Sequence, residues 1–178
     1  KSKLVRYIDA GFPIIYVNTF EEDKVDTIIS EIKSGKEVYE WNETDGYIDF
    51  ETKTPMMEDC TLEGLLDQLK TMDRKLIVLK DVTAYLDEPR LVSKIKGIAR
   101  LINQGADANV IIVSTTLVIP KELEKYITIL EMDYLSTDEI KGIIKSFIKE
   151  TGIENISSSL VDELATAFKG LTEFEINK

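Results

Sequence analysis

Short runs of aliphatic and β-branched residues alternate along this chain with segments of helical periodicity. This alternation limits the possible folds more than any single motif does. Residues 14–19 and 75–81 are near-continuous apolar runs, typical of strands that are buried on both faces. Parallel strands need crossover helices between them, so the pattern predicts an α/β domain with a parallel sheet. The expected strands cover residues 14–19, 37–42, 75–81, 109–115 and 126–130.

Apolar residues recur three and four positions apart in the segments between these strands, as on one face of a helix. Residues 43–61 are polar, carry Gly46 and Pro55, and are expected to form the longest loop. A short helical turn is expected at residues 119–123. The expected crossover helices cover residues 25–32, 62–69 and 89–104.

The C-terminal part of the sequence predicts helices without strands. Ser136 and Glu139 have the spacing of a capping box ahead of an apolar helical stripe, and a further helix is expected over residues 158–168. Thr172 and Glu175 repeat the capping-box spacing close to the last residue, where too little chain follows for a stable helix. We therefore expect the chain to be a fragment of a longer protein.

No glycine lies between Gly11 and Gly35, a stretch that includes the passage from the first strand to its helix. A phosphate-binding loop at this passage needs glycines that adopt positive φ, and a lysine followed by serine or threonine. The chain instead places Glu21, Glu22 and Asp23 at the start of the helix. Carboxylates favour the positive end of a helix dipole and would repel a triphosphate. The sequence therefore argues against a phosphate loop here.

Composition removes several further classes of function. Cys60 is the only cysteine and histidine is absent, which excludes disulfides within the chain, most zinc sites and every histidine-based mechanism. Cys60 has no activating neighbour in the sequence and is expected to be inert. The formal net charge of −11 argues against a nucleic-acid surface. The single cysteine fits a reduced, cytoplasmic compartment, and no apolar window is long enough to span a membrane, so we expect a cytoplasmic protein with neither nucleic-acid nor membrane partners.

Several stretches of the sequence carry a resemblance to a known family. They are residues 10–22, residues 38–41 with Gly46, residues 79–81, residues 119–123 and residues 170–172. On them the chain resembles AAA+ ATPase modules, and more closely the N-terminal module of tandem AAA ATPases related to an uncharacterised plastid and cyanobacterial reading frame. The resemblance implies a P-loop-NTPase-like, three-layer α/β sandwich with a five-stranded parallel sheet of order 2-3-4-1-5. It also implies an AAA+-like domain over residues 1–135 and a truncated helical lid over 136–178.

The functional positions of an AAA+ module look altered in this sequence. Lys80 and Asp81 replace the Asp-Glu pair that ends the third strand, and a lysine is unfit to bind Mg²⁺ there. Ser114 and Thr115 fall where the γ-phosphate is usually sensed, but hydroxyls that bond the next turn are the simpler interpretation. No arginine follows Arg100, so the finger and lid arginines are missing. The vestigial positions are Glu21, Glu22, Lys80, Asp81, Ser114 and Thr115.

Two local interpretations follow for individual side chains. Lys80 is expected to form an ion pair with Glu21, Glu22 or Asp81 and so to fill the empty phosphate seat, rather than to act as a general base or Schiff-base lysine. Residues 46–48 lie where AAA+ rings present an aromatic pore loop, but a turn glycine with a packed tyrosine is the simpler interpretation, as is plain packing for the tryptophan at position 41.

The resemblance implies a non-hydrolysing structural or regulatory module of a larger AAA ATPase. Its expected partners are the C-terminal ATPase module of the same chain and further copies of itself. No catalytic residue, cofactor or metal ligand is expected in this segment, whereas ATP and Mg²⁺ are expected in a following module of the parent ATPase. Three alternatives stay open: a nucleotide-binding but hydrolysis-deficient domain, a clamp-loader-like scaffold, and a receiver-like domain using Asp81 and Thr115. Asn18 and Thr19 disfavour the receiver-like domain, because such a domain needs an acidic pair that holds Mg²⁺ at the end of the first strand.

Overall fold

The computed structural model describes residues 3–32, 35–57, 60–69, 73–132 and 137–151. The chain divides into two compact units, Lys1–Leu130 and Glu131–Lys178. The sheet and every site discussed below belong to the first unit. Ser136 of the expected capping box, the helix expected over residues 158–168 and the capping-box spacing after it all lie outside the described residues.

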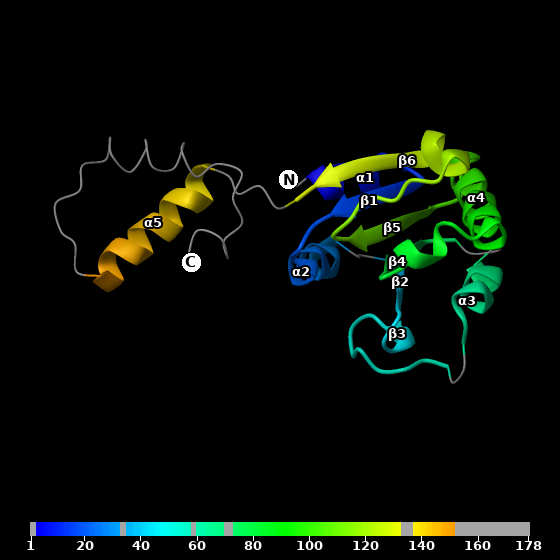
Figure 1. Cartoon of the computed structure of the whole chain (residues 1–178), viewed down its shortest axis with the longest axis horizontal. Coiled ribbons are helices and arrows are strands. Elements are labelled where there is room, and N and C mark those ends of the chain that lie inside the picture. The colour runs from blue at the N-terminus through cyan, green and yellow to red at the C-terminus, as the bar shows by residue number, and fades with distance from the viewer. Residues whose placement is uncertain (1–2, 33–34, 58–59, 70–72, 133–136, 152–178) are drawn as a thin grey trace. The chain divides into compact units, whose positions relative to one another are not determined.

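Six strands form one mixed sheet in the order β3-β2-β4-β5-β1-β6 (Figure 1). Strand β2 pairs in parallel with β4, β4 with β5, and β5 with β1, whereas β3 runs antiparallel to β2. The strands are β1 (Ile14–Asn18), β2 (Glu37–Asn42), β3 (Gly46–Asp49), β4 (Lys75–Lys80), β5 (Ala108–Ser114) and β6 (Ile127–Glu131).

The prediction of a five-stranded parallel sheet of order 2-3-4-1-5 was wrong in the number of strands and in being all parallel, because the antiparallel strand β3 forms within the loop expected over residues 43–61 and lies outside β2. The five predicted strands keep the expected order among themselves, as β2-β4-β5-β1-β6. The hairpin turns at Gly46, whose φ is 72°, and Asn42 Oδ1 accepts a hydrogen bond of 2.7 Å from the Asp45 N–H. Pro55 then bridges to Ile48 on the outer side of β3. A strand of four residues is too short for its alternation to be recognised in the sequence.

Helices pack on both faces of the sheet because successive side chains of a strand point to opposite sides. One face joins Tyr16, Leu79 and Ile112 to the buried residues of α3 and α4 in a single core. On the other face, Val17 and Val78 are fully buried. The helices of the first unit are α1 (Lys3–Asp9), α2 (Glu22–Ile32), α3 (Leu62–Gln68) and α4 (Pro89–Asn103), with 3₁₀ turns η2 (Thr83–Tyr85) and η3 (Lys121–Tyr126).

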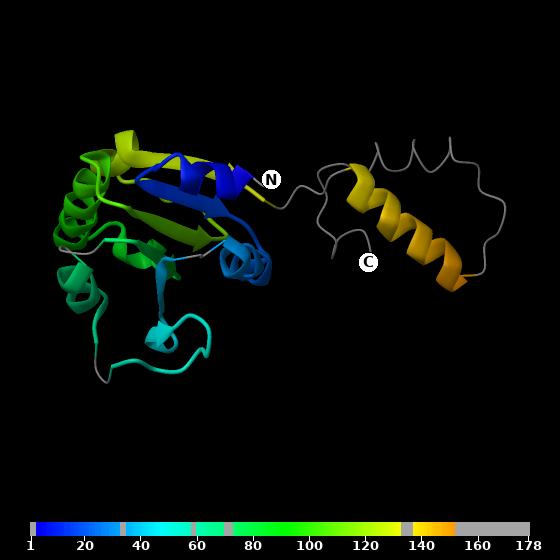
Figure 2. The ribbon, with the colours of Figure 1, turned by 180° about the vertical axis from the view of Figure 1, so that it is seen from behind.

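The expected helices after the first, second and third predicted strands are confirmed as α2, α3 and α4, and α3 lies next to α4 in both views (Figures 1 and 2). Helix α4 begins at Pro89 and is followed by Gly105, whose φ is 114°, as the sequence indicated. Helix α1 was not predicted. In the second unit, α5 (Thr137–Thr151) buries Ile140 and Ile144 one turn apart.

Candidate functional site

The ends of three neighbouring parallel strands define the candidate site. Strand β4 ends at Lys80, β5 at Ser114 and β1 at Asn18, and all three carboxyl ends lie at one edge of the sheet. In open α/β sheets ligands bind at this edge. The structure therefore brings the vestigial positions of the sequence to one edge, and the contacts there decide what the edge can do.

The passage from β1 to α2 is short and closed by its own hydrogen bonds. Three residues separate Asn18 from Glu22, the first residue of α2. Thr19 is fully buried, its N–H donates to Ser114 O at 2.9 Å, and its Oγ1 accepts from Glu21 N–H at 3.0 Å. Among residues 12–32 none has a positive φ. The passage therefore lacks the backbone conformation that turns successive N–H groups toward a phosphate.

Four charged side chains meet on the α2 side of this edge, and we call Asp26, Glu40, Lys53 and Lys80 the buried charge cluster, after its buried members Glu40 and Lys80; Lys53 itself is exposed. Lys80 is only 5% exposed, and its Nζ lies 3.0 Å from Asp26 Oδ2 and 3.2 Å from Glu40 Oε1. Lys53 Nζ lies 3.0 Å from the same Asp26 oxygen and 2.5 Å from the same Glu40 oxygen. Two cations thus face two carboxylates, so the cluster is balanced by residues of the chain itself.

The predicted ion-pair partners of Lys80 were wrong, because Lys80 pairs with Asp26 and Glu40 instead of Glu21, Glu22 or Asp81. Glu40 is reached because β2 lies beside β4 in parallel register. Asp26 lies one helical turn beyond Glu22 on α2.

The three expected partners lie elsewhere around the strand ends. Glu21 forms an ion pair of 2.9 Å with Lys24. Asp81 is exposed and has a left-handed φ of 60°. Glu22 is half-buried beside the buried charge cluster.

The electrostatics of the edge favour charged lysine and oppose further negative charge. Burial lowers the pKa of Lys80, but its hydrogen bonds and charge interactions with Asp26 and Glu40 outweigh burial and raise the pKa above the ordinary value of 10.5. Burial raises the pKa of Glu22; Lys80 lowers it, and the nearby carboxylates of Asp81, Asp26 and Glu40 raise it further. A triphosphate placed here would meet the same repulsion.

The loop after β5 is held by hydroxyl groups. Ser114 Oγ accepts a hydrogen bond of 3.2 Å from Thr116 N–H, which is the local role that the sequence suggested, and Thr115 is exposed. The Tyr16 hydroxyl of β1 donates to Thr116 O at 2.7 Å and accepts from Val118 N–H at 3.1 Å. Sequence reasoning missed Tyr16 because its position in an apolar run indicated only packing. Ser114, one of the two groups that would sense a phosphate, is therefore engaged in shaping this loop.

Other site chemistries receive little support from the described part of the chain. It contains no group of three or more His, Cys, Asp or Glu side chains placed to hold a metal ion. Burial raises the pKa of the Cys60 thiol, which disfavours the reactive thiolate. In the same described ranges, no helix combines the length and apolar character needed to cross a membrane.

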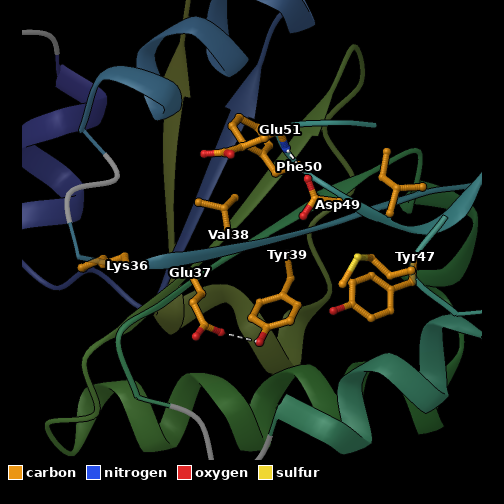
Figure 3. Close-up of a pocket in the computed structure, with 10 residues that line it drawn as sticks. Lys36, Glu37, Val38, Tyr39, Tyr47, Asp49, Phe50 and Glu51 are labelled. Atoms are coloured by element: carbon orange, nitrogen blue, oxygen red, sulfur yellow. Dashed lines mark hydrogen bonds between the residues drawn. The ribbon is translucent and has the colours of Figure 1, made fainter. Parts of the chain in front are cut away.

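A pocket of about 340 Å³ lies at the β2–β3 hairpin (Figure 3). Tyr39 and Tyr47 lie on one side of β2 with ring centroids 5.7 Å apart, whereas Phe50 lies on the other side (Figure 3). The Tyr39 hydroxyl donates to Glu37 at 2.8 Å, and burial raises the pKa of Tyr47 to about 12. Tyr47 is 7% exposed, so it is packed in the core as the sequence indicated and is not presented on a loop.

Sequence comparison places the chain among AAA proteins. Residues 1–132 match the family described as SpoVK-like AAA ATPase, N-terminal domain. The uncharacterized AAA domain-containing proteins ycf46 of Trieres chinensis and Pyropia yezoensis are each 30% identical to the chain, over 96% of its length and 35% of theirs. The chain therefore spans about a third of the length of these curated relatives.

Solved structures with the same fold are more distant in sequence. A chain of the E. coli MS115-1 HORMA:CdnC:Trip13 complex superposes with a TM-score of 0.54 at 13% identity, covering 99% of this chain and 68% of that one. C. elegans PCH-2 gives a TM-score of 0.52 at 12% identity, with coverage of 98% and 59%. At such low identity these matches establish a common α/β fold and nothing more specific.

Proposed function

The chain belongs to the SpoVK-like AAA ATPase N-terminal domain family, and from this premise we propose that it is a non-hydrolysing structural or regulatory module of a larger AAA protein. The observation that carries the proposal is the passage from β1 to α2, where three residues, closed by the side chain of Thr19, take the place of a glycine-rich phosphate loop. Without a cradle of N–H groups, the edge has no means of holding a triphosphate in line for attack by water.

The buried charge cluster supports the same proposal. In an ATPase the strand-end carboxylates hold Mg²⁺ and position water. Here Lys80 ends β4 and is tied to Asp26 and Glu40, so the positive charge comes from the chain itself. We place ATP and Mg²⁺ in a following module of the parent protein, and assign this module no catalytic residue, cofactor or metal.

The contacts that we propose for the module use the strand-end surface. Phe20 follows β1 and is 70% exposed, while Leu117 and Val118 follow the neighbouring β5 and are 43% and 36% exposed. Exposed apolar side chains that gather at one edge are typical of interaction sites. The expected partners are the ATPase module of the same parent chain and other copies of this module.

Nucleotide binding is the direct test of the silent site. Titration of the 178-residue chain with a fluorescent ATP analogue and Mg²⁺ is expected to show no saturable binding at micromolar concentrations. The reason is that the passage from β1 to α2 presents carboxylates and lacks a phosphate loop. Saturable micromolar binding that unlabelled ATP reverses would instead establish the hydrolysis-deficient, nucleotide-binding alternative.

Self-association tests the contact role separately. Phe20→Ser is expected to weaken association of the chain in sedimentation velocity experiments while changing the free energy of unfolding by less than about 0.5 kcal/mol, because the ring is exposed. Met56→Ser removes another exposed apolar side chain, from the β3–α3 connection, and serves as the matched control. Equal association of the two variants and the wild type would remove Phe20 from the proposed contact surface.

A further inference from the structure

The two edges of the sheet differ in how they are protected. At the β3 edge the chain folds back along the strand, and Pro55 bridges to Ile48. Beside this bridge, Met56 N–H donates to Tyr47 O at 3.0 Å. A proline and a returning loop are devices by which proteins keep an edge from pairing with another chain. The backbone groups at the β3 edge are therefore used within the chain.

Strand β6 forms the opposite edge. It lies beside β1 at the end of the sheet order and is the outermost strand in both views (Figures 1 and 2). Alternate N–H and C=O groups of an edge strand point away from its neighbour. Among the described residues, no segment other than β1 pairs with residues 128–130. This edge can therefore accept a further strand.

Chirality determines which groups of β6 point outward. In β5, Val110 faces the core formed with α3 and α4, and its N–H donates to Pro13 O, toward β1. In L-residues the side chain and the backbone groups keep a fixed hand, so strands that run in one direction share this relation. Strand β6 runs in the direction of β5 (Figure 1), and Ile127 packs against the same core. The N–H and C=O of Ile129, two residues on, therefore point away from β1.

The sequence of β6 carries none of the usual devices that protect an edge. Residues 127–130 read Ile-Thr-Ile-Leu and contain no proline, glycine or charged residue. Ile129, in the middle of the strand, is 42% exposed, whereas Leu130 on the other face is 4% exposed. Apolar edges of this kind pair with strands of other chains. In a chain of net charge −11, this neutral stretch lets two copies approach without direct repulsion.

We propose that β6 pairs with β6 of a second copy, antiparallel and centred on Ile129. A two-fold axis requires the antiparallel direction, and Ile129 is the middle residue of the five, so the whole strand pairs. The two Ile129 side chains then cover each other. Glu131 of each copy lies opposite Ile127 of the other, which leaves the two glutamates about 13 Å apart, beyond the screening length of about 8 Å at physiological salt.

The β6 pairing gives the contact with further copies, which the proposed function includes, a second surface of defined geometry, and it rests on that role. Five residue pairs bury much less than the roughly 1,600 Å² of a standard interface, so the dimer is weak and forms only at high concentration of the chain.

Disulfide trapping tests the register directly. Cys60→Ser removes the only cysteine, and Ile129→Cys then places one thiol at the proposed axis. Opposite residues of antiparallel strands have Cα atoms about 4.5–5.5 Å apart, within the range of a disulfide. Under mild oxidation by copper phenanthroline, a covalent dimer should form about tenfold faster than with Leu101→Cys, because only thiols held opposite each other react as a positioned pair. Leu101 lies on α4 and is 40% exposed, so it is a matched control.

Charge substitutions test the same contact in solution. Ile129→Lys and Ile129→Glu each set like charges opposite each other and are expected to weaken self-association in sedimentation velocity roughly tenfold. An equimolar mixture of the two variants should regain association, because opposite charges then face each other across the axis. Leu101→Lys is the control and should associate as the wild type does. Circular dichroism confirms that each variant is folded.

The pairing is overturned by equal cross-linking rates at positions 129 and 101, by wild-type association of Ile129→Lys, by a mixture that does not recover, or by a wild type that stays monomeric at every concentration. Phe20→Ser should leave cross-linking at position 129 unchanged, because Phe20 is not part of β6. Failure here is therefore distinguishable from failure of the strand-end contact, and ATP titration reports on the silent site separately.

Discussion

Replacing Lys80 by methionine is expected to lower the free energy of unfolding by about 3 kcal/mol, because in the described contacts Asp26 and Glu40 then keep Lys53 as their only cationic partner. Methionine retains most of the apolar stem, so the loss reports on the missing charge. Urea unfolding followed by circular dichroism measures it. Lys24→Met breaks the more exposed pair with Glu21 and should cost at most about 1 kcal/mol.

A second substitution separates the charge from the packing at this position. Lys80→Met together with Asp26→Leu removes one cation and one carboxylate and leaves Lys53 with Glu40, so much of the lost stability should return. The cluster interpretation fails if Lys80→Met costs no more than Lys24→Met. It also fails if the double variant loses more free energy of unfolding than the two single variants lose together.

The stability difference between the wild type and Lys80→Met should depend on pH in a definite direction. The folded pKa of Lys80 lies above its ordinary value, because the interactions with Asp26 and Glu40 outweigh the opposing effect of burial. The stabilisation is therefore fully present below pH 10.5, the ordinary pKa, and is lost as the pH rises through the higher folded value. The stability gap between the wild type and Lys80→Met should stay constant from neutral pH to about pH 10 and narrow only above it.

Replacing Trp41 by alanine is expected to cost about 3–5 kcal/mol, because the buried ring belongs to the core that also contains the buried residues of α3 and α4. Trp41→Phe should cost far less, since phenylalanine keeps part of the ring and removes the indole N–H that has no acceptor. Both variants lack tryptophan fluorescence, so thermal unfolding is followed by circular dichroism. Equal losses for the two variants would show that the N–H finds a partner.

The sequence predicted the parallel part of the fold because its signals are long and repeated. Strands β1 and β4 are uninterrupted apolar runs, and α4 shows helical periodicity between Pro89 and Gly105. The sequence did not reveal β3, whose four residues pair only through a turn, or α1, which precedes the first strand. Short elements such as these depend on tertiary packing more than on local pattern.

The sequence predicted that the candidate site lacks a phosphate loop, but it did not predict the buried charge cluster. The missing glycines and the lysine at position 80 can be read directly from the sequence. Lys80 pairs with a carboxylate on β2 and another on α2, and Lys53, 27 residues away in the β3–α3 connection, pairs with the same two carboxylates. The parallel register of β2 with β4 brings Glu40 beside Lys80, whereas Asp26 and Lys53 come from other elements. A glutamate within β2, where an apolar residue would normally face a helix, was the one available signal.

The two lysines and two carboxylates of the buried charge cluster are covalently part of one chain, so their ratio never changes. A protein held together by a bound ligand loses stability as the ligand is depleted, by mass action. With its counter-ions built in, the charge balance of this edge does not depend on the ATP concentration of the surrounding solution. In the proposed pair with an ATPase module, this would be the half whose strand ends need no nucleotide.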